Sequence, residues 1–317
     1  MILAFPGVEE NFFHLSLFLQ NLSNGLANGA VYALMALTVV IIYKTTGHLN
    51  FAQGEMAMFS TFLIFVLTVE HRWNVWLSLM AIVGLMMLTG AAIHRGLIRP
   101  LEKRSVLGPV ILTLGLFFIL NGLAAKIWGT QPRNPIPQPF PGALNDKIDI
   151  LDGPPKFFIT YKAIGVWATV AVLVILVNLL LKKTKLGLAY RAVAANAESS
   201  LLAGIPVQRM LMLGWALAAG IGTIAGAIIA EYRGVLDFNF MGAILLYGFA
   251  AAALGGFDSI AGAVVGGLLV GLIETFVPAF FTLIGTELSL VMVLAVIMIV
   301  LYFRPQGLFG SKRVERV

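Results

Sequence analysis

The chain consists mainly of long apolar segments separated by short polar stretches. Each apolar segment approaches the ~20 residues that a helix needs to cross the hydrocarbon core of a bilayer. These segments lie at about 22–43, 50–69, 75–93, 107–126, 161–181, 210–230, 240–257, 259–280 and 287–303. A further apolar stretch at 11–20 is too short to span alone, which leaves the count at the N-terminus open by one. Because a helix satisfies its own backbone in lipid, the pattern predicts an all-α polytopic membrane protein. We expect about eight or nine transmembrane helices in one domain over residues 1–317.

Composition supports a membrane protein. Apolar residues make up 59% of the chain and charged residues only 11%, compared with roughly 25% charged residues in soluble domains. Cysteine is absent, which excludes disulfides and cysteine metal sites. The histidines, which lie at span ends without a ligand spacing, are His14, His48, His71 and His94. The sequence therefore predicts no metal and no cofactor.

Basic residues are divided unevenly between two sides of the predicted bundle. One side carries Lys44, Arg95, Arg99, Lys103, Arg104, Lys182, Lys183, Lys185, Arg191, Arg209, Arg304, Lys312, Arg313 and Arg316. The other side carries Arg72, Lys126, Arg133, Lys147, Lys156, Lys162 and Arg233, in longer and more acidic segments. Since positive loops stay in the cytoplasm, we expect the C-terminus inside and the N-terminus outside. The net charge of +6 comes from this asymmetry, so it indicates membrane lipid as a partner and not nucleic acid.

A proline-rich loop of about 127–160 is expected on the outer side. Its prolines are Pro132, Pro135, Pro137, Pro139, Pro141, Pro154 and Pro155. Proline supports neither regular helix nor a central strand, so we expect a semi-rigid loop and not a separate domain. Two interpretations stay open: a plain connector between spans, or a surface on which an outside partner lands.

The basic loop 182–209 contains signals for one very short helix. Asn196 can cap its first amides, and Glu198 lies favourably near the positive end of the dipole. Gly204 and Pro206 stop the helix. A sharply bounded helix on the basic side can present a surface to a partner, although an ordinary connector is an equal alternative.

Glycines four residues apart recur inside the apolar segments. This spacing places two small residues on one helix face and lets backbones approach closely. The pairs are Gly25 and Gly29, Gly222 and Gly226, Gly262 and Gly266, and Gly267 and Gly271. They predict a tightly packed bundle.

Polar residues interrupt the apolar pattern at the entrance of the second segment. Asn50, Gln53 and Glu55 lie between Gly47 and Gly54. A carboxylate about one turn inside a membrane helix is costly unless it has polar partners or meets water. One hypothesis is that these residues line a translocation path or gate. The alternative is that they cap the second span and brace the first.

Several motifs together resemble one family. Asn50-Phe-Ala-Gln-Gly-Glu55 looks like the Asn-Phe-Ala-(His/Gln)-Gly-Glu motif of the permeases of branched-chain amino acid ABC importers. Further stretches that resemble the family are Tyr190-Arg-Ala with Leu202-Ala-Gly-Ile205, Leu254-Gly-Gly-Phe-Asp-Ser-Ile-Ala-Gly-Ala263, and Arg304-Pro-Gln-Gly-Leu-Phe-Gly310. They follow in order over nearly the whole chain and resemble the Liv H-type half more than its M-type partner. Urea and amide permeases share the pattern, so the substrate stays open.

The resemblance implies an inner-membrane subunit that works with two ABC ATPases, a second permease subunit and a periplasmic or lipid-anchored binding protein. It also implies a coupling helix that docks on an ATPase, built here from Asn196, Glu198, Ser199, Leu201, Leu202 and Gly204. The family's Glu-Ala-Ala…Gly loop is matched only in part, because Val193 stands where that loop has an acidic residue.

The source of energy separates the remaining alternatives. The chain contains no Gly-Lys pair and therefore no P-loop, so ATP hydrolysis is expected on separate subunits. A stand-alone secondary carrier would need membrane-embedded titratable groups, and the main candidates are Glu55, Asp258, Glu274 and Glu287. A membrane enzyme would need a convergent catalytic set, and none has a recognisable spacing. The sequence favours the importer permease over the carrier or channel.

Overall fold

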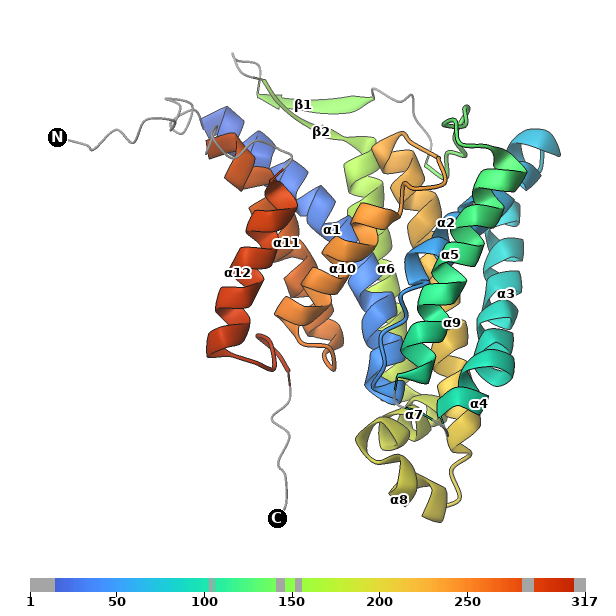
Figure 1. The fold of residues 1–317 in the computed structure, drawn as a ribbon. Helices are drawn as coiled ribbons and strands as arrows, with labels where there is room; N and C mark the ends of the chain where they lie inside the picture. Colours follow the sequence, from blue (N-terminus) through green and yellow to red (C-terminus); the bar gives the residue numbers. More distant parts are fainter. Residues whose placement is uncertain are drawn as a thin grey trace.

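The computed structural model describes residues 15–102, 105, 107–140, 146–151, 156–280 and 288–310. These residues form a bundle of helices with one small hairpin at its upper edge (Figure 1). The helices are α1 (Leu15–Thr46), α2 (Gln53–Phe65), η2 (Val66–Glu70), α3 (Val75–Ile93), η3 (His94–Ile98), α4 (Arg99–Glu102), α5 (Gly108–Trp128), α6 (Tyr161–Lys183), α7 (Lys185–Ala195), α8 (Ala197–Leu202), α9 (Val207–Arg233), α10 (Gly242–Gly255), α11 (Ile260–Phe280) and α12 (Ser289–Phe303). The strands are β1 (Lys147–Leu151) and β2 (Phe157–Thr160).

Among the described residues, 6 helical segments are long and apolar enough to cross a membrane. They are α1, the continuous run from α3 to α4, α5, α6, α9 and α11. Three other predicted segments contain shorter apolar helices, namely α2 with η2, α10 and α12. The short apolar stretch that begins before the first predicted span is not a separate helix from Leu15 onward, because α1 runs unbroken for 32 residues. The chain is therefore a multi-pass helical membrane protein.

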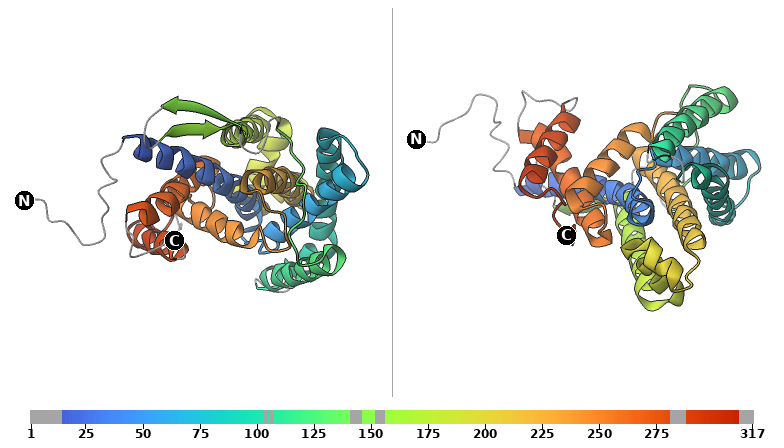
Figure 2. Two further views of the ribbon diagram at one scale, coloured as in Figure 1. Left: turned by 90° about the horizontal axis from the view of Figure 1, so that it is seen from above. Right: turned by 60° about the horizontal axis from the view of Figure 1, so that its bottom comes forward.

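Two helices form the centre of the bundle. The apolar window of α1 is 89% buried and that of α9 is 78% buried, whereas the window of α5 is only 11% buried. Helices α3, α5 and α6 therefore surround the centre and turn apolar faces outward, as lipid requires. The view from above shows α1 crossing the bundle obliquely (Figure 2).

The predicted glycines lie where helix backbones meet. A Cβ added at Gly29 would stand 2.7 Å from the Cα of Leu268, on α11. Gly222 and Gly226 of α9 face α2, where a Cβ on Gly226 would stand 2.7 Å from the carbonyl oxygen of Ala57. The remaining members also lie at helix contacts: Gly25 faces α11, Gly262 and Gly266 face α10, and Gly267 and Gly271 face α1. Small residues thus set the α1–α11, α2–α9 and α10–α11 crossings.

The proline-rich loop contains more regular structure than the sequence predicts. β1 and β2 form an antiparallel pair with Lys147 opposite Thr160, and a register shift follows Asp149. The loop is thus structured over 147–151 and 157–160, and the fold over the described residues is helical apart from this hairpin. The described prolines of this loop lie before β1, whereas Pro141, Pro154 and Pro155 lie outside the described residues.

The polar ends of the bundle differ. Figure 1 places α4, α7 and α8 at the lower end together with the last described residues of the chain, and the hairpin at the upper end. The start of α1 also lies at the upper end. Residues 1–14 and the carboxylate candidate Glu287 lie outside the described residues. So do these members of the predicted inner set: Lys103, Arg104, Lys312, Arg313 and Arg316.

Candidate functional site

Helix α2 begins inside the bundle and not at its surface. The side-chain amide of Gln53 donates a hydrogen bond of 3.0 Å to the carbonyl oxygen of Ala218. Ala218 lies near the middle of the 27-residue helix α9, about 16 Å along its axis from Val207. The chain after α1 therefore re-enters the bundle in extended form before α2 starts (Figure 1).

Asn50 supports this buried start. Its Oδ1 accepts a 3.0 Å hydrogen bond from the backbone amide of Ala52, and its Nδ2 donates to Oε1 of Gln53 at 3.1 Å. The amide of Phe51 donates to the hydroxyl of Thr113, on α5, at 3.4 Å. Backbone groups outside a helix have no water here, so these contacts supply partners that the chain would otherwise lack.

Glu55 contacts the helix α5 that flanks α2. Its side chain is buried, and its Oε2 accepts a 3.3 Å hydrogen bond from Nδ2 of Asn121. The same nitrogen lies 2.9 Å from the carbonyl oxygen of Phe238 and 3.1 Å from Oδ1 of Asn239, in the segment between α9 and α10. An amide nitrogen carries two hydrogens, so these three acceptors share them. The polar cluster therefore joins α2, α5 and the α9–α10 connection.

The three predicted residues thus lie at a helix start and face other helices. Gln53 braces α2 against α9, not against the first span as the alternative hypothesis held. Asn121 was missed, although a single asparagine within the apolar α5 is a recognised signal for a functional or packing role. Among the described residues, no hydrogen bond or ion pair joins this cluster to the glycine-rich stretch 254–262. That stretch instead contacts the C-terminal segment, where the amide of Leu308 donates to Leu254 O at 2.8 Å.

A second polar cluster, partly buried, was not predicted. Tyr32 of α1 donates a 2.6 Å hydrogen bond to Oε2 of Glu274 on α11, and it accepts one of 2.8 Å from Arg233 at the end of α9. Arg233 also lies 4.0 Å from Oε1 of Glu274. The ring of Tyr247 stacks on Tyr32 at 4.6 Å. Because these residues are far apart in sequence, no local pattern could bring them together.

The lower end of the bundle carries the short helix that the loop sequence predicts. Asn196 accepts a 2.8 Å hydrogen bond from the amide of Ser199, which caps α8. Gly204 has a positive φ of 79°, and its amide donates to Leu201 O at 3.0 Å, which ends the turn. The final two residues of α8 are strongly exposed: Leu201 at 65% and Leu202 at 90%.

Helix α7 precedes α8 and was not predicted. The hydroxyl of Thr184 accepts a 3.0 Å hydrogen bond from the amide of Gly187, so a threonine cap was the available signal. Tyr190 is fully buried, and its hydroxyl donates to the carbonyl oxygen of Ile41 on α1. Burial raises the pKa of Tyr190 well above its usual range, so the hydroxyl remains a donor. Helix α7 is thus fixed to the bundle, while α8 projects from it (Figure 1).

Over the described part of the chain, no group of three or more acidic, histidine or cysteine side chains could hold a metal ion. The polar clusters instead connect helices of a membrane bundle, and a small apolar helix projects at one end. These features define a polytopic membrane protein with internal polar helix junctions, of the kind found in transport subunits.

Comparison with known proteins identifies the family. The family described as "Branched-chain amino acid transport system / permease component" matches residues 21–301. The chain belongs to this family. It is 30% identical to the "High-affinity branched-chain amino acid transport system permease protein BraD" of Pseudomonas aeruginosa, over 95% of this chain and 98% of that protein. It is 28% identical to the permease protein LivH of Escherichia coli (strain K12), with the same shares covered.

The family is not confined to one substrate. The "Fructose import permease protein FruF" of Bifidobacterium longum is 26% identical over 82% of this chain and 73% of that protein. No solved structure matches the chain. The relatives are named as transport permeases and not as enzymes.

Proposed function

We propose that the chain is the membrane-spanning permease subunit of an ATP-binding-cassette importer. It would move branched-chain or related amino acids across a bacterial cytoplasmic membrane by alternating access. Family membership over residues 21–301 supports the class. The observation that carries the mechanism is the projecting helix α8, which exposes Leu201 and Leu202 instead of burying them. Two leucines left in water at the end of a capped helix are explained by a partner that covers them.

The partners follow from this role. Two ABC ATPase subunits would bind at the lower end of the bundle, and a second permease, identical or homologous, would complete the path. A periplasmic or lipid-anchored binding protein would deliver substrate at the hairpin end. The positive-inside rule places α8 and the C-terminus in the cytoplasm. A ligand drives the transport cycle only through different affinities for its states.

We propose nine crossings for this topology. Helices α1, α5, α6, α9 and α11 and the run from α3 to α4 each account for one crossing. The other three would be completed by α2 with η2, by α10 and by α12, whose helices are shorter than the ~20 residues of a full span. An odd number agrees with the start of α1 and the end of α12 on opposite sides (Figure 1).

The docking role of α8 can be tested with one charge. Leu201→Asp places a carboxylate in an interface that should bury the side chain, and burial of an unpaired charge is strongly unfavourable. We expect loss of co-purifying ATPase and of uptake. Leu151→Asp, an exposed leucine on the hairpin at the opposite end, is the matched control and should leave ATPase assembly unchanged. Normal assembly of the Leu201→Asp variant with the ATPase would show that α8 is not the coupling helix.

Glu55 can be tested separately from the fold. The substitution Glu55→Gln keeps the hydrogen bond from Asn121, because the amide oxygen of the new side chain can still accept it. Glu55→Ala removes the acceptor. A path or gating role predicts that uptake falls in both variants while expression and complex formation stay normal. A purely structural role predicts normal uptake in Glu55→Gln and loss of the folded complex in Glu55→Ala.

Energy coupling gives the decisive test of the proposal. The purified chain alone in liposomes should neither hydrolyse ATP nor concentrate leucine, isoleucine or valine under an imposed proton or sodium gradient. Uptake should appear only when ATPases, partner permease and binding protein are added. Accumulation by the chain alone would establish a secondary carrier instead. If the complete system transported urea or a short amide but not leucine, the chain would be a permease of the same family with a different substrate.

A further inference from the structure

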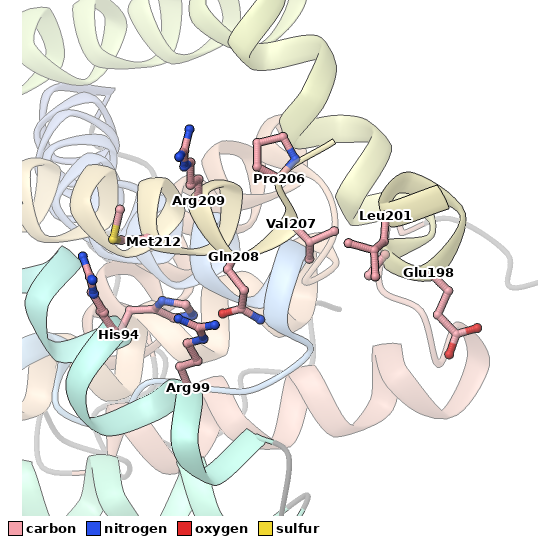
Figure 3. Close-up of a pocket in the computed structure, with 11 residues that line it drawn as sticks. His94, Arg99, Glu198, Leu201, Pro206, Val207, Gln208, Arg209 and Met212 are labelled. Atoms are coloured by element: carbon pink, nitrogen blue, oxygen red, sulfur yellow. The ribbon is translucent and has the colours of Figure 1, made fainter. Parts of the chain in front are cut away.

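A cavity of about 680 Å³ lies beside α8 at the lower end of the bundle. One wall is formed by His94 and Arg95 of η3 and by Arg99 of α4, and the opposite wall includes Leu201 of α8 and Gln208 of α9 (Figure 3). The cavity therefore separates the end of a membrane helix from the projecting helix. Neither the polar junctions nor the proposed ATPase contact uses its basic wall.

The cavity lies at the level of lipid headgroups. The run from α3 to α4 begins at Val75, so His94 is about 28 Å along the helix at 1.5 Å per residue. This distance is close to the ~30 Å thickness of the hydrocarbon core. Arg95 and Arg99 follow within the next turn and a half, which places them in the interfacial layer on the cytoplasmic side.

The basic wall has unused capacity for an anion. Within the described part of the chain, neither Arg95 nor Arg99 forms an ion pair with a carboxylate. His94 is 1% exposed, and its Nε2 has no hydrogen-bond partner among the described residues. The nearest acidic oxygen to this nitrogen, Oε1 of Glu102, is 3.7 Å away, beyond hydrogen-bond distance. An unpaired buried imidazole nitrogen is costly unless a ligand or water satisfies it.

The side chains are arranged for one shared ligand. In Figure 3, His94, Arg99 and Gln208 point toward one another, while the carboxylate of Glu198 points away from them. Oε1 of Gln208 is buried without a partner among the described residues. Rotation of this amide by half a turn presents its NH2 group in the same place, so the position can donate as well as accept. A guanidinium, an imidazole and an amide together suit the oxygens of a phosphate group.

The neighbouring surface favours a lipid as the source of that phosphate. Leu88 of α3 is 72% exposed and Leu97 of η3 is 45% exposed. The helix run that carries the basic wall thus also carries exposed apolar side chains, and these two features match the two parts of an acidic phospholipid. We propose that the cavity binds the phosphodiester headgroup of an anionic phospholipid, with its acyl chains on the outer face of α3 and η3.

The position of the site has a consequence for α8. The bound headgroup would lie between the basic wall and Leu201, and so would hold α8 at a fixed distance from the bundle. This consequence rests on the proposed coupling role of α8, whereas lipid binding itself does not.

Native mass spectrometry of the purified chain tests the proposal. The probes are phosphatidylglycerol and, at equal concentration, phosphatidylcholine. We expect the unmodified chain to retain phosphatidylglycerol selectively. The double variant Arg95→Gln, Arg99→Gln should retain about thirtyfold less, since each of the two basic groups near a membrane surface contributes about 1 kcal/mol. The matched control is Arg72→Gln with Lys126→Gln, two exposed basic residues of the outer end, and it should retain the lipid normally.

Two further measurements separate the alternatives. The charge-preserving variant Arg95→Lys, Arg99→Lys should keep most of the binding, and tryptophan fluorescence should confirm that each variant remains folded. Glycerol phosphate at millimolar concentration should not displace the lipid. Binding of glycerol phosphate without selectivity for phosphatidylglycerol would make this a free-anion site and overturn the proposal. Unchanged lipid retention in the Gln variant, together with loss of ATPase assembly, would assign the wall to the protein interface and also overturn it.

Discussion

The crossing of α1 and α11 gives a sharp test of the packing argument. At Gly29, an added Cβ would stand 2.7 Å from the Cα of Leu268 and 2.9 Å from the carbonyl oxygen of Gly267. Ordinary van der Waals contact for a Cβ is 3.4–4 Å. Because the opposing atoms are backbone, no side chain can rotate away. Gly29→Ala therefore forces the two helices apart by about 1 Å or bends one of them, and such overpacking costs about 1–3 kcal/mol.

A second glycine isolates this packing cost. Gly122 lies in α5, where an added Cβ would meet nothing within 4 Å. Any glycine-to-alanine change inside a helix stabilises it by roughly 0.8–1 kcal/mol through backbone entropy and propensity. This gain is common to Gly29→Ala and Gly122→Ala, so it cancels in their comparison. The difference between the two variants is then the packing term alone, about 1–3 kcal/mol.

Thermal unfolding in detergent, followed by tryptophan fluorescence, measures the difference. At about 2–4 °C per kcal/mol for domains somewhat smaller than this chain, Gly29→Ala should unfold several degrees below Gly122→Ala. Gly122→Ala should match or exceed the unmodified chain. Equal midpoints for the two variants would show that α1 and α11 do not pack through Gly29, and would refute the placement of the crossing.

Three other substitutions test separate contacts. Gln53→Leu removes the hydrogen bond to the middle of α9 while nearly keeping the volume, and should lower the free energy of unfolding by about 1 kcal/mol in a denaturation series. Tyr32→Phe removes the hydroxyl that bonds Glu274, and should cost about 1–3 kcal/mol, whereas Tyr302→Phe, at an exposed ring, should leave the unfolding midpoint unchanged. Asn196→Ala should destabilise α8 by about 1 kcal/mol and weaken ATPase pull-down, and Asn196→Asp should restore it because aspartate also caps.

Local signals account for what could be predicted. Every predicted apolar segment contains an apolar helix in its described part, because exclusion of water from the bilayer makes length and hydropathy sufficient. The capped helix α8 was predicted for a similar reason: Asn196 and Gly204 each act within a few residues of themselves. The glycine spacing predicted close helix contacts, although it could not name the partner helices.

Contacts between distant segments account for what could not be predicted. Tyr32 and Glu274 are in contact only because α1 crosses α11, and no sequence pattern specifies that crossing. The hairpin of β1 and β2 was not predicted, because its residues carry only a weak strand pattern and the loop around it is rich in proline. The start of α2 inside the bundle was also hidden, because an extended chain within the membrane has the same apolar composition as a helix.

The buried start of α2 explains why its motif contains three polar residues with different tasks. Asn50 satisfies the backbone amide of Ala52, a need that exists only because the chain is extended where no water reaches it. The Nε2 of Gln53 donates a hydrogen bond to α9, and its Oε1 accepts one from Asn50, so both polar atoms of this side chain have protein partners. Glu55 differs, because its one side-chain hydrogen-bond donor among the described residues is an amide nitrogen of Asn121 that is shared with two other acceptors. Asn50 and Gln53 therefore each bond through both polar side-chain atoms to protein groups. Because the donor that reaches Glu55 is shared, the carboxylate keeps the most acceptor capacity for a transported solute or water. We therefore expect Glu55 to be the position where a transport defect appears without a folding defect.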